Sequence, residues 1–496
     1  MDAFCDSLFR REGMGDVLAG RKLAAMKTQQ GIGIDFGTSN SLAAVHHAGR
    51  TRFVQLEADT PVMPTATYLD RDFQVLTGQA AISRYIDDNT GRTVELVPEV
   101  LGESSILVGA AGANSREAPE TMTQKVYGPA LEDPGLPGRL FRGLKRLLGD
   151  PHTRRLMVFG QPYRLVALIT PVLLRIRKEI ERSSAPQCSA SLAGPLRCGH
   201  PVRFEGRDPN RQKLALERLQ EACKHAGLLG SGIDFGFFPE PVAAALSWRA
   251  AAAETKGTAL VFDFGGGTLD LALLHFDGDD HRILATAGVA IGGDHIDQRL
   301  FRELLFPLLG KGELWRRWGD ERMIETRFPF EQYEELLLNW TVGYTLNQNR
   351  FRHPVMDCMR QPPPAGPKFR RLFDLITRNM GYQLFQEVAA TKVRLSALES
   401  TVLDLPELDI AVPVKRVTFE AMIDDILLRI ESVVDDILQQ SDLAATQVDV
   451  VVRTGGSSLI PAVARLLERR FPGLVVDHDP FGSVADGLSI AAARGL

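Results

Sequence analysis

The 496-residue chain has few cysteines, no strong excess of charge of either sign and no long apolar run. Its 5 cysteines are odd in number and scattered, so we expect no disulfide framework of the kind that holds small secreted domains together. They are Cys5, Cys188, Cys198, Cys223 and Cys358. A formal net charge of -5 gives no overall electrostatic footprint for nucleic acid or an anionic membrane. No apolar run reaches the roughly 18 residues that span a bilayer.

These absences favour a cytoplasmic protein that binds neither nucleic acid nor membrane. The hydrophobic content of 44% and the charged content of 24% are ordinary for a globular protein. The length predicts two to four domains or subdomains. Residues 1–30 lack the apolar block of a signal peptide, so we expect a disordered extension or an over-long gene start there, with Met26 as an alternative start.

One pattern occurs twice: an apolar strand, an Asp, a Gly-rich turn and a second strand. The first copy is Ile32-Gly33-Ile34-Asp35-Phe36-Gly37-Thr38-Ser39-Asn40-Ser41, and the second is Leu260-Val261-Phe262-Asp263-Phe264-Gly265-Gly266-Gly267-Thr268-Leu269-Asp270. A single copy is weak evidence, because Asp-x-Gly turns join ordinary hairpins. Two copies far apart predict two related lobes that grip one nucleotide from opposite sides.

The residue types in both turns suit a nucleoside triphosphate. Glycine lets backbone N–H groups approach phosphate closely, and the hydroxyls of Thr38, Ser39 and Thr268 add donors. Mg²⁺ is usually held by one or two carboxylates, waters and phosphates, so Asp35 and Asp263 are candidate ligands through water. Asp270 could add an outer carboxylate. No Gly-x-x-x-x-Gly-Lys-Ser/Thr loop is present.

A third element is the stretch 448–461, which predicts a buried strand, a Gly455-Gly456 turn and a helix that starts near Pro461. The two glycines let an adenosine lie flat against the backbone, with Ser457 beside it. After two phosphate turns, this third position strengthens the prediction of an ATP or ADP site.

The order and wording of these motifs resemble the actin, hexokinase and heat-shock ATPase superfamily, and most closely the nucleotide-binding domain of DnaK-type chaperones (heat shock protein 70 family). Further matching segments are 144–149, 240–245, 292–297 and 78–81. Segments 199–204 and 481–484 look more like the truncated YegD-type branch. The likeness covers about residues 30–300 and 380–496.

The resemblance implies roles for matching positions. Lys145 is expected to orient the attacking water and to stabilise charge on the γ-phosphate, and Glu240 to help place water around Mg²⁺. With these two, Asp35, Asp263 and Thr268 form the expected catalytic set. The expected nucleotide-binding set is Gly37, Thr38, Ser39, Asn40, Gly265, Gly266, Gly267, Thr268, Gly292, Gly293, Asp294, Lys392, Ser396, Gly455, Gly456 and Ser457.

The chain departs from the family pattern around the base. Ala389 and Val393 stand where the chaperones carry Glu and Arg, and Leu459 replaces the Arg that packs on adenine. Phe481 stands where the chaperones have Asp. We therefore expect more apolar contacts to the base, with altered nucleotide affinity or base selectivity.

Alternating strands and helices predict an α/β fold, and the resemblance implies the two-lobed actin-like ATPase fold, with duplicated RNase H-like domains and inserted subdomains. We expect lobe I at 31–255 with an insert at about 69–154, and lobe II at 256–483 with an insert at about 301–399. A last helix at 484–496 is expected to pack back on lobe I. We read 89–138 as loops and 301–380 as a solvated helical subdomain.

The resulting hypothesis is an Mg-ATP-binding protein and slow ATPase, a chaperone-like switch that acts on a client or co-chaperone. DnaK-type chaperones continue into a peptide-binding domain, and we expect none here. The alternatives are a metabolite kinase of the same superfamily and an actin-like structural ATPase.

Overall fold

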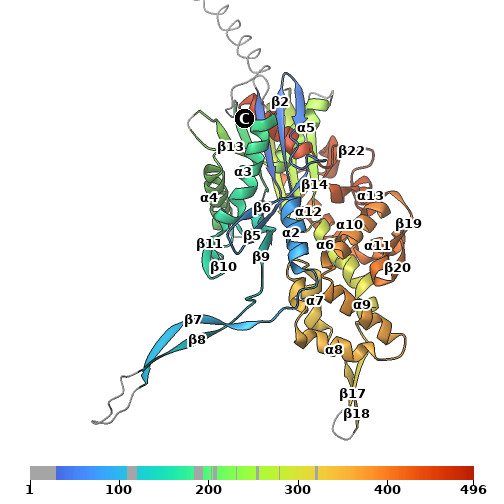
Figure 1. Ribbon diagram of the computed structural model, residues 1–496. Coiled ribbons are helices and arrows are strands. Elements are labelled where there is room, and N and C mark those ends of the chain that lie inside the picture. Colours follow the sequence, from blue (N-terminus) through green and yellow to red (C-terminus); the bar gives the residue numbers. More distant parts are fainter. Residues whose placement is uncertain are drawn as a thin grey trace, which may run out of the picture.

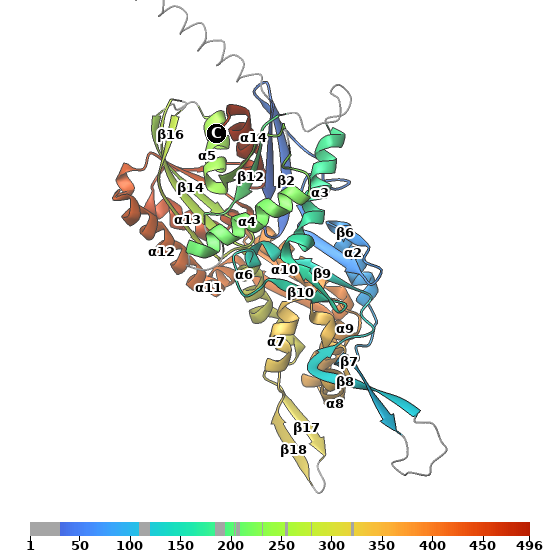
Figure 2. The same ribbon diagram turned by 90° about the vertical axis from the view of Figure 1, so that its left-hand side faces the viewer.

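The computed structural model describes residues 30–108, 120–183, 194–202, 204, 209–230, 232–252, 256–278, 280–318 and 322–496. The expected extension at 1–30 lies outside these residues, apart from residue 30. Two lobes lie side by side in Figures 1 and 2, each built on its own sheet.

The lobe I sheet has the order β13-β12-β1-β2-β3, and the short β4 (Met63–Pro64) also pairs with β2. Its strands are β1 (Gly31–Phe36), β2 (Asn40–His47), β3 (Arg50–Phe53), β12 (Leu196–His200) and β13 (Phe235–Pro239). β1 runs antiparallel to β2 and parallel to β12, and β12 runs parallel to β13.

The lobe II sheet repeats this plan in the order β16-β15-β14-β21-β22. Its strands are β14 (Lys256–Phe264), β15 (Leu269–Asp277), β16 (Asp280–Val289), β21 (Val450–Thr454) and β22 (Val475–Asp477). β14 is antiparallel to β15 and parallel to β21, as β1 is to β2 and β12. The predicted α/β fold with two related mixed sheets is therefore confirmed, and Asp35 on β1 corresponds to Asp263 on β14.

Helices follow equivalent strands in the two lobes. They are α3 (Leu165–Ser183), α4 (Pro209–His225) and α5 (Glu240–Ala251) in lobe I, and α12 (Asp424–Ser441), α13 (Pro461–Arg470) and α14 (Ser483–Arg494) in lobe II. α14 lies against β1 and β2, so a Cβ at Gly31 or Gly33 would collide with its backbone. α5 lies against β14 and β15, and it crosses α14 where Gly487 meets Ala243. Each lobe therefore contributes a helix to the other sheet.

The lobe I insert holds a small sheet, β6-β5-β9, covered by α2. Its elements are β5 (Ala66–Asp70), β6 (Val75–Thr77), α2 (Gln79–Asn89), β7 (Val97–Val108), β8 (Glu120–Glu132), β9 (Gly138–Arg142), β10 (Arg155–Val158) and β11 (Gln161–Arg164). β7 and β8 form a long hairpin that projects from the body (Figure 1). The interpretation of 89–138 as loops was wrong, because β7 and β8 lie within it.

Other local predictions also needed correction. The sequence of 141–148 favours a short basic helix, but the segment is the end of β9 and a 3-10 turn at Leu144–Leu147, separated by Gly143 at φ +65°. The sequence also favours a loop at 183–199 and a strand at 201–204, but the strand is β12, which begins at Leu196; residues 184–193 lie outside the described residues. The sequence of 419–439 favours one helix, but two helices, α11 (Arg416–Met422) and α12, meet at Ile423.

The lobe II insert is mainly helical, as predicted for 301–380. Its elements are α6 (Gly293–Leu300), β17 (Leu314–Trp318), β18 (Met323–Arg327), α7 (Glu331–Leu338), α8 (Asn349–Met359), α9 (Ala365–Thr377), α10 (Gly381–Ala397), β19 (Ser400–Leu405) and β20 (Ile410–Lys415). Although we expected a solvated subdomain, the insert has a hydrophobic core, since Phe306, Phe328 and Phe369 are fully buried.

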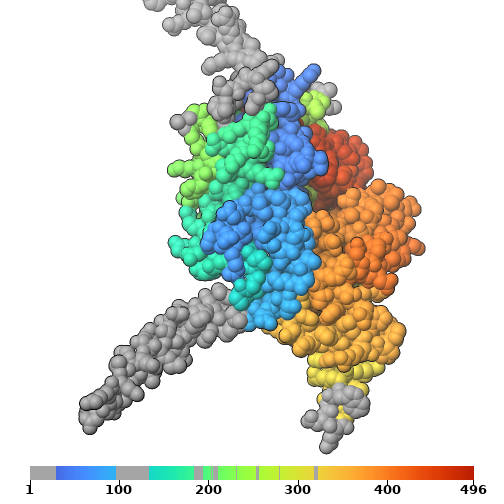
Figure 3. Space-filling model, in the orientation of Figure 1, coloured from blue at the N-terminus to red at the C-terminus, as the bar shows by residue number. Residues whose placement is uncertain are grey.

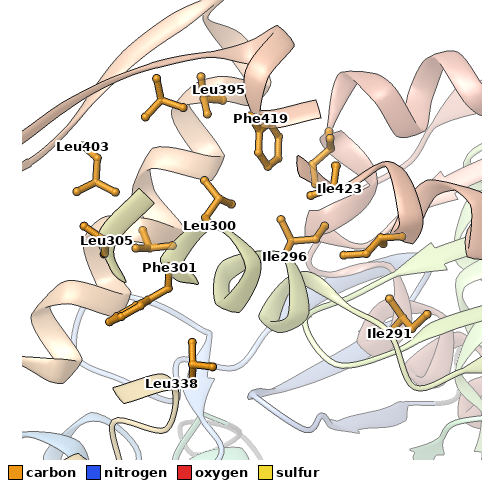
Figure 4. Packing of buried hydrophobic residues seen from close by; sticks show 14 of the residues in the cluster. Ile291, Ile296, Leu300, Phe301, Leu305, Leu338, Leu395, Leu403, Phe419 and Ile423 are labelled. Carbon is orange, nitrogen blue, oxygen red and sulfur yellow. The ribbon is translucent and has the colours of Figure 1, made fainter. Parts of the chain in front are cut away.

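A single hydrophobic cluster joins this insert to the lobe II sheet. Figure 4 shows Ile296, Leu300 and Phe301 of the α6 region among Leu338, Leu395, Leu403 and Phe419, with the Phe301 ring turned toward Leu338. Burial of each such side chain stabilises the fold by roughly 1.5–3 kcal/mol. The insert is therefore anchored to the sheet that carries Asp263. None of the helices in the described residues is long and apolar enough to cross a membrane.

Candidate functional site

A cavity of about 700 Å³ lies between the two lobes, and residues from both Gly-rich turns line it. The predicted site residues that line it are Asp35, Gly37, Thr38, Ser39, Asn40, Lys145, Glu240, Asp263, Gly265, Gly266, Gly267, Thr268, Lys392, Ser396, Gly455, Gly456 and Ser457. Gly292, Gly293 and Asp294 stand just behind the second turn. The fold therefore brings residues from 35 to 457 to one place.

Four carboxyl groups gather in the cavity region around the ammonium of Lys145, and a second ammonium, that of Lys392, also lines the cavity. Asp35 and Asp263 end equivalent strands, and Asp270 lies opposite Asp263 on β15. Glu240 starts α5, and its Oε1 lies 2.6 Å from the Nζ of Lys145. The other three carboxyl groups lack an ion-pair partner in the described residues, so the buried site carries an excess of negative charge.

The pKa values of these three carboxyls lie above their ordinary values. Burial is the main cause that raises the pKa of Asp35 to about 7; Glu240 adds to the rise, and Lys145 opposes it. Burial also raises the pKa of Asp270 to about 7, although its hydrogen bond from the Val202 N–H acts the other way. Burial and the neighbouring carboxylates raise the pKa of Asp263 well above its ordinary value.

For Lys145, the neighbouring carboxylates together change the pKa more than burial does. Burial alone lowers its pKa, but Glu240 and Asp35 outweigh burial, so its pKa lies above the ordinary value. The ammonium therefore stays charged in the cavity. Lys145 sits in the 3-10 turn that follows Gly143, which places its side chain at the mouth of lobe I opposite Asp263.

The second turn is held by backbone hydrogen bonds. The Gly265 N–H donates to the Thr268 carbonyl at 3.0 Å, and the Gly293 N–H donates to the Gly265 carbonyl at 3.0 Å. The Asp294 N–H donates to the Gly266 carbonyl at 2.8 Å. A Cβ at Gly292 would collide with Gly266, so the close approach requires glycine there. Segment 292–294 thus packs against the second turn and fixes its conformation through these hydrogen bonds.

A polar bridge crosses the cavity mouth. The Ser39 hydroxyl of lobe I donates to Oδ2 of Asp294 in lobe II at 3.2 Å. The Arg146 guanidinium lies 3.4 Å from the same oxygen. Arg146 also lines the cavity beside Gly267, although the sequence reasoning gave it no role. Its place next to Lys145 was the one signal that could have pointed to it.

The far end of the cavity is formed by the third motif. Gly455 has φ +81°, and a Cβ there would collide with Phe264. The Ser457 hydroxyl donates to the Gly265 carbonyl at 2.8 Å, which ties this motif to the second phosphate turn. Lys392 of α10 forms an ion pair with Asp297 at 2.9 Å. Val393, Leu459 and Phe481 line the same end.

The donor set fits a divalent cation held through water and phosphate. In the described ranges, no three His, Cys, Asp or Glu side chains lie close enough together to ligate a metal directly. Hard oxygen ligands beside phosphate turns are what Mg²⁺ prefers, and it keeps several of its waters. The excess of buried carboxylate over ammonium is the observation that fits a cation there.

The inserts of the two lobes also touch each other across the cleft. Tyr85 of α2 is buried, and its hydroxyl donates to the carbonyls of Trp340 at 3.2 Å and Thr341 at 2.7 Å. The Tyr85 ring meets the Trp340 and Tyr344 rings edge to face at 5.8 and 6.2 Å between centroids. In Figure 3 the blue surface of α2 meets the orange surface of lobe II. We call Tyr85, Trp340, Thr341 and Tyr344 the aromatic bridge.

Comparisons with known proteins agree with this geometry. Residues 207–308 and 370–493 match the model of the family described as Hsp70 protein. The chaperone protein dnaK1 of Synechocystis is 23% identical over 474 residues, which cover 93% of this chain and 54% of that protein. The chain is therefore similar to Hsp70 proteins. The matched residues contain the second turn, Lys392 and the Gly455-Gly456 turn.

Two further relatives are similar to this chain. The heat shock 70 kDa protein BIP3 of Oryza sativa subsp. japonica is 25% identical over 468 residues, which cover 93% of this chain and 56% of that protein. The chaperone protein DnaK of Mycoplasmoides gallisepticum is 26% identical over 330 residues, which cover 63% of this chain and 46% of that protein. The chain spans about half the length of the curated relatives it matches.

Proposed function

We propose that this chain binds Mg-ATP between its lobes and hydrolyses it slowly, as a chaperone-like switch. The observation that supports the proposal most directly is the single cavity lined by both Gly-rich turns and by the buried Lys145–Glu240 pair. A hydrolytic phosphoryl transfer needs positioning and charge stabilisation more than covalent chemistry, so this sparse set of groups suffices.

Each group has a proposed task. The backbone N–H groups of Gly37, Gly266 and Gly267 hold the phosphates, with the hydroxyls of Thr38 and Thr268. Asp35 and Asp263 hold the waters around Mg²⁺, which when bound neutralises charge on the phosphates. Lys145 orients the attacking water and stabilises charge that develops on the γ-phosphate.

Glu240 is proposed to fix Lys145 through their 2.6 Å contact and to accept from the water shell. The buried location raises the strength of these interactions over what they would have in water. We propose that the partner is a protein client or co-chaperone that binds differently when the lobes close, because the chain is similar to Hsp70 proteins. The kinase and filament alternatives are not favoured, because the family match is to Hsp70.

The test follows the γ-phosphate of labelled Mg-ATP with wild type and Lys145→Ala. We expect release as free phosphate, reduced about 100-fold or more in the variant, as when a charge-stabilising donor is removed from an active site. Lys256→Ala removes an exposed lysine and should leave the rate unchanged.

Lys145→Ala leaves Glu240 buried without its partner, which can destabilise the fold by about 3–5 kcal/mol. The double variant Lys145→Ala with Glu240→Gln removes that charge, and it should melt near wild type while staying inactive. Transfer of the label to a small molecule from cell extract would contradict the proposal and favour a kinase.

A further inference from the structure

Three large apolar side chains are exposed at one end of the nucleotide cavity. Val393 is 66% exposed, Leu459 is 38% exposed and Phe481 is 63% exposed. They come from three separate elements: α10, the 3-10 turn at Gly456–Leu459 and the loop before α14. All three line the same cavity as the phosphate turns. Water-facing apolar groups gathered at one cavity end indicate that a flat apolar surface covers them when the site is filled.

The position of this end follows from the phosphate turns. Phosphates held at Gly37–Asn40 and Gly265–Thr268 leave the remaining cavity lining, which includes Val393, Leu459 and Phe481, for the rest of the nucleotide. We propose that these three side chains hold the nucleobase by its faces alone, so that the site accepts ATP and GTP alike. The inference rests on the proposed function, since it concerns the same nucleotide.

Phe481 is the natural stacking surface. Its ring lies against Gly456, where a Cβ would be only 3.0 Å from a ring carbon. The backbone of the third motif therefore supports the ring from one side and leaves its other face free for a base. Val393 approaches from α10, in a different part of lobe II. Every base presents an apolar face, so contacts of this kind do not distinguish one purine from another.

The polar side chains at this end of the cavity are occupied within the protein. Lys392 pairs with Asp297 and also donates to the Gly293 carbonyl at 3.2 Å. The Ser457 hydroxyl donates to Gly265, and the Thr454 and Ser483 hydroxyls bond to each other at 2.7 Å. They are therefore poorly placed to read the edge of a base.

Ser396, one turn from Val393 on α10, is the remaining polar side chain at this end among the described lining residues. Its hydroxyl donates to the Lys392 carbonyl at 3.3 Å. A hydroxyl can donate or accept, so it serves the amino group of adenine or the carbonyl of guanine. Strong rejection of a near-isostere requires a site built to hydrogen-bond one partner, which is lacking in this set. The exposed walls also leave the base edges in contact with water.

The experiment is a calorimetric titration of the full chain with ADP, GDP and CDP in Mg²⁺. We expect the dissociation constants of ADP and GDP to agree within about tenfold, because apolar contacts discriminate weakly. CDP should bind more weakly than both, because its smaller base covers less of the Phe481 ring.

Phe481→Ala should weaken ADP and GDP binding equally, by about tenfold, the usual size of a base–aromatic stacking loss. Phe481→Trp keeps a stacking surface and should restore binding of both. Val393→Ala should weaken both by a smaller factor. Val417→Ala is the matched control, an exposed valine (70%) on α11 away from the cavity, and it should change nothing.

Two results overturn the inference alone: ADP binding with GDP at least about 100-fold weaker, or ADP and GDP binding that Phe481→Ala leaves unchanged. CDP binding as tight as that of the purines also overturns it. A titration in which neither ADP nor GDP binds overturns the proposed function together with this inference.

Discussion

At the scale of single residues, the site holds several carboxyl groups whose ionised form is unfavourable there. Asp270 is buried and Asp35 and Asp263 are partly buried, and all three carboxyls have raised pKa values. The nearby ammonium of Lys145 is already paired with Glu240. Structures that concentrate like charge in this way do so where a ligand of opposite charge binds. We therefore expect ionisation of these carboxyls to lower the stability of the nucleotide-free protein.

The first prediction concerns pH. Because the folded pKa of Asp35 and Asp270 is about 7 and the unfolded value is near 4, the folded state binds more protons between these values. Stability should fall as pH rises from about 4 to 7, and the loss should be complete above 7. Melting of wild type beside Asp270→Asn should show a gap that widens in favour of the variant over that window.

A constant gap across that window, or a gap that widens as the pH falls, would contradict this account of the carboxyls. The matched control is Asp425→Asn, which changes an exposed aspartate on α12, and its melting difference should show no such trend.

The second prediction concerns Gly455. Alanine there meets both an unfavourable positive φ of +81° and a collision with the Phe264 carbonyl. Gly473 also has positive φ, at +72°, but has open space around its Cβ position. Gly473→Ala should cost about 1 kcal/mol of stability, and Gly455→Ala clearly more, in chemical denaturation. Equal losses would mean that the third motif is looser than its contacts indicate.

At the scale of elements, the aromatic bridge joins the inserts of the two lobes. The Val94 N–H donates to the Asn347 carbonyl at 3.0 Å, and the Asn347 amide donates to the Arg92 carbonyl at 2.7 Å. Together with Tyr85 and Trp340, these contacts join the inserts of two different lobes. Opening the cleft requires breaking them, so they should slow the escape of a bound nucleotide.

The third prediction tests this role. Tyr85→Phe removes the hydroxyl that donates to two lobe II carbonyls, and it should speed release of bound ADP by about tenfold. Tyr333→Phe is the matched control, because its buried hydroxyl donates to Phe351 at 2.8 Å inside lobe II. A stopped-flow chase with fluorescent ADP measures both. Equal rates in the two variants would show that the bridge does not hold the cleft closed.

Elements also show how far sequence reasoning reached. α13 and α14 were predicted, the first from the Gly455-Gly456 turn and Pro461 and the second as the last helix at 484–496. β7 and β8 were missed because residues 89–138 show no clear periodicity in the sequence.

The same distinction applies to the site. Both phosphate turns, Lys145 and Gly455 could be placed from short local motifs. The contact of Tyr85 with Trp340 spans 255 positions and depends on how two inserts meet, which no local pattern records. Arg146 was missed for the same reason, because its partner Asp294 lies in the other lobe.

At the scale of the whole molecule, the chain is two copies of one plan that exchange helices. α5 leaves the lobe I sheet and packs on lobe II, and α14 leaves the lobe II sheet and packs on lobe I. Each Asp-bearing strand thereby faces its counterpart across one cavity rather than two. The central claim is that both Gly-rich turns bind the same nucleotide.

The most direct test is the binding stoichiometry of Mg-ADP, measured by calorimetry on the full chain. One nucleotide per chain, lost when either Gly37 or Gly266 is replaced by valine while folding is retained, is the predicted result. Two nucleotides per chain, or one whose affinity depends on only one of the turns, would contradict the claim that the two lobes share a single site.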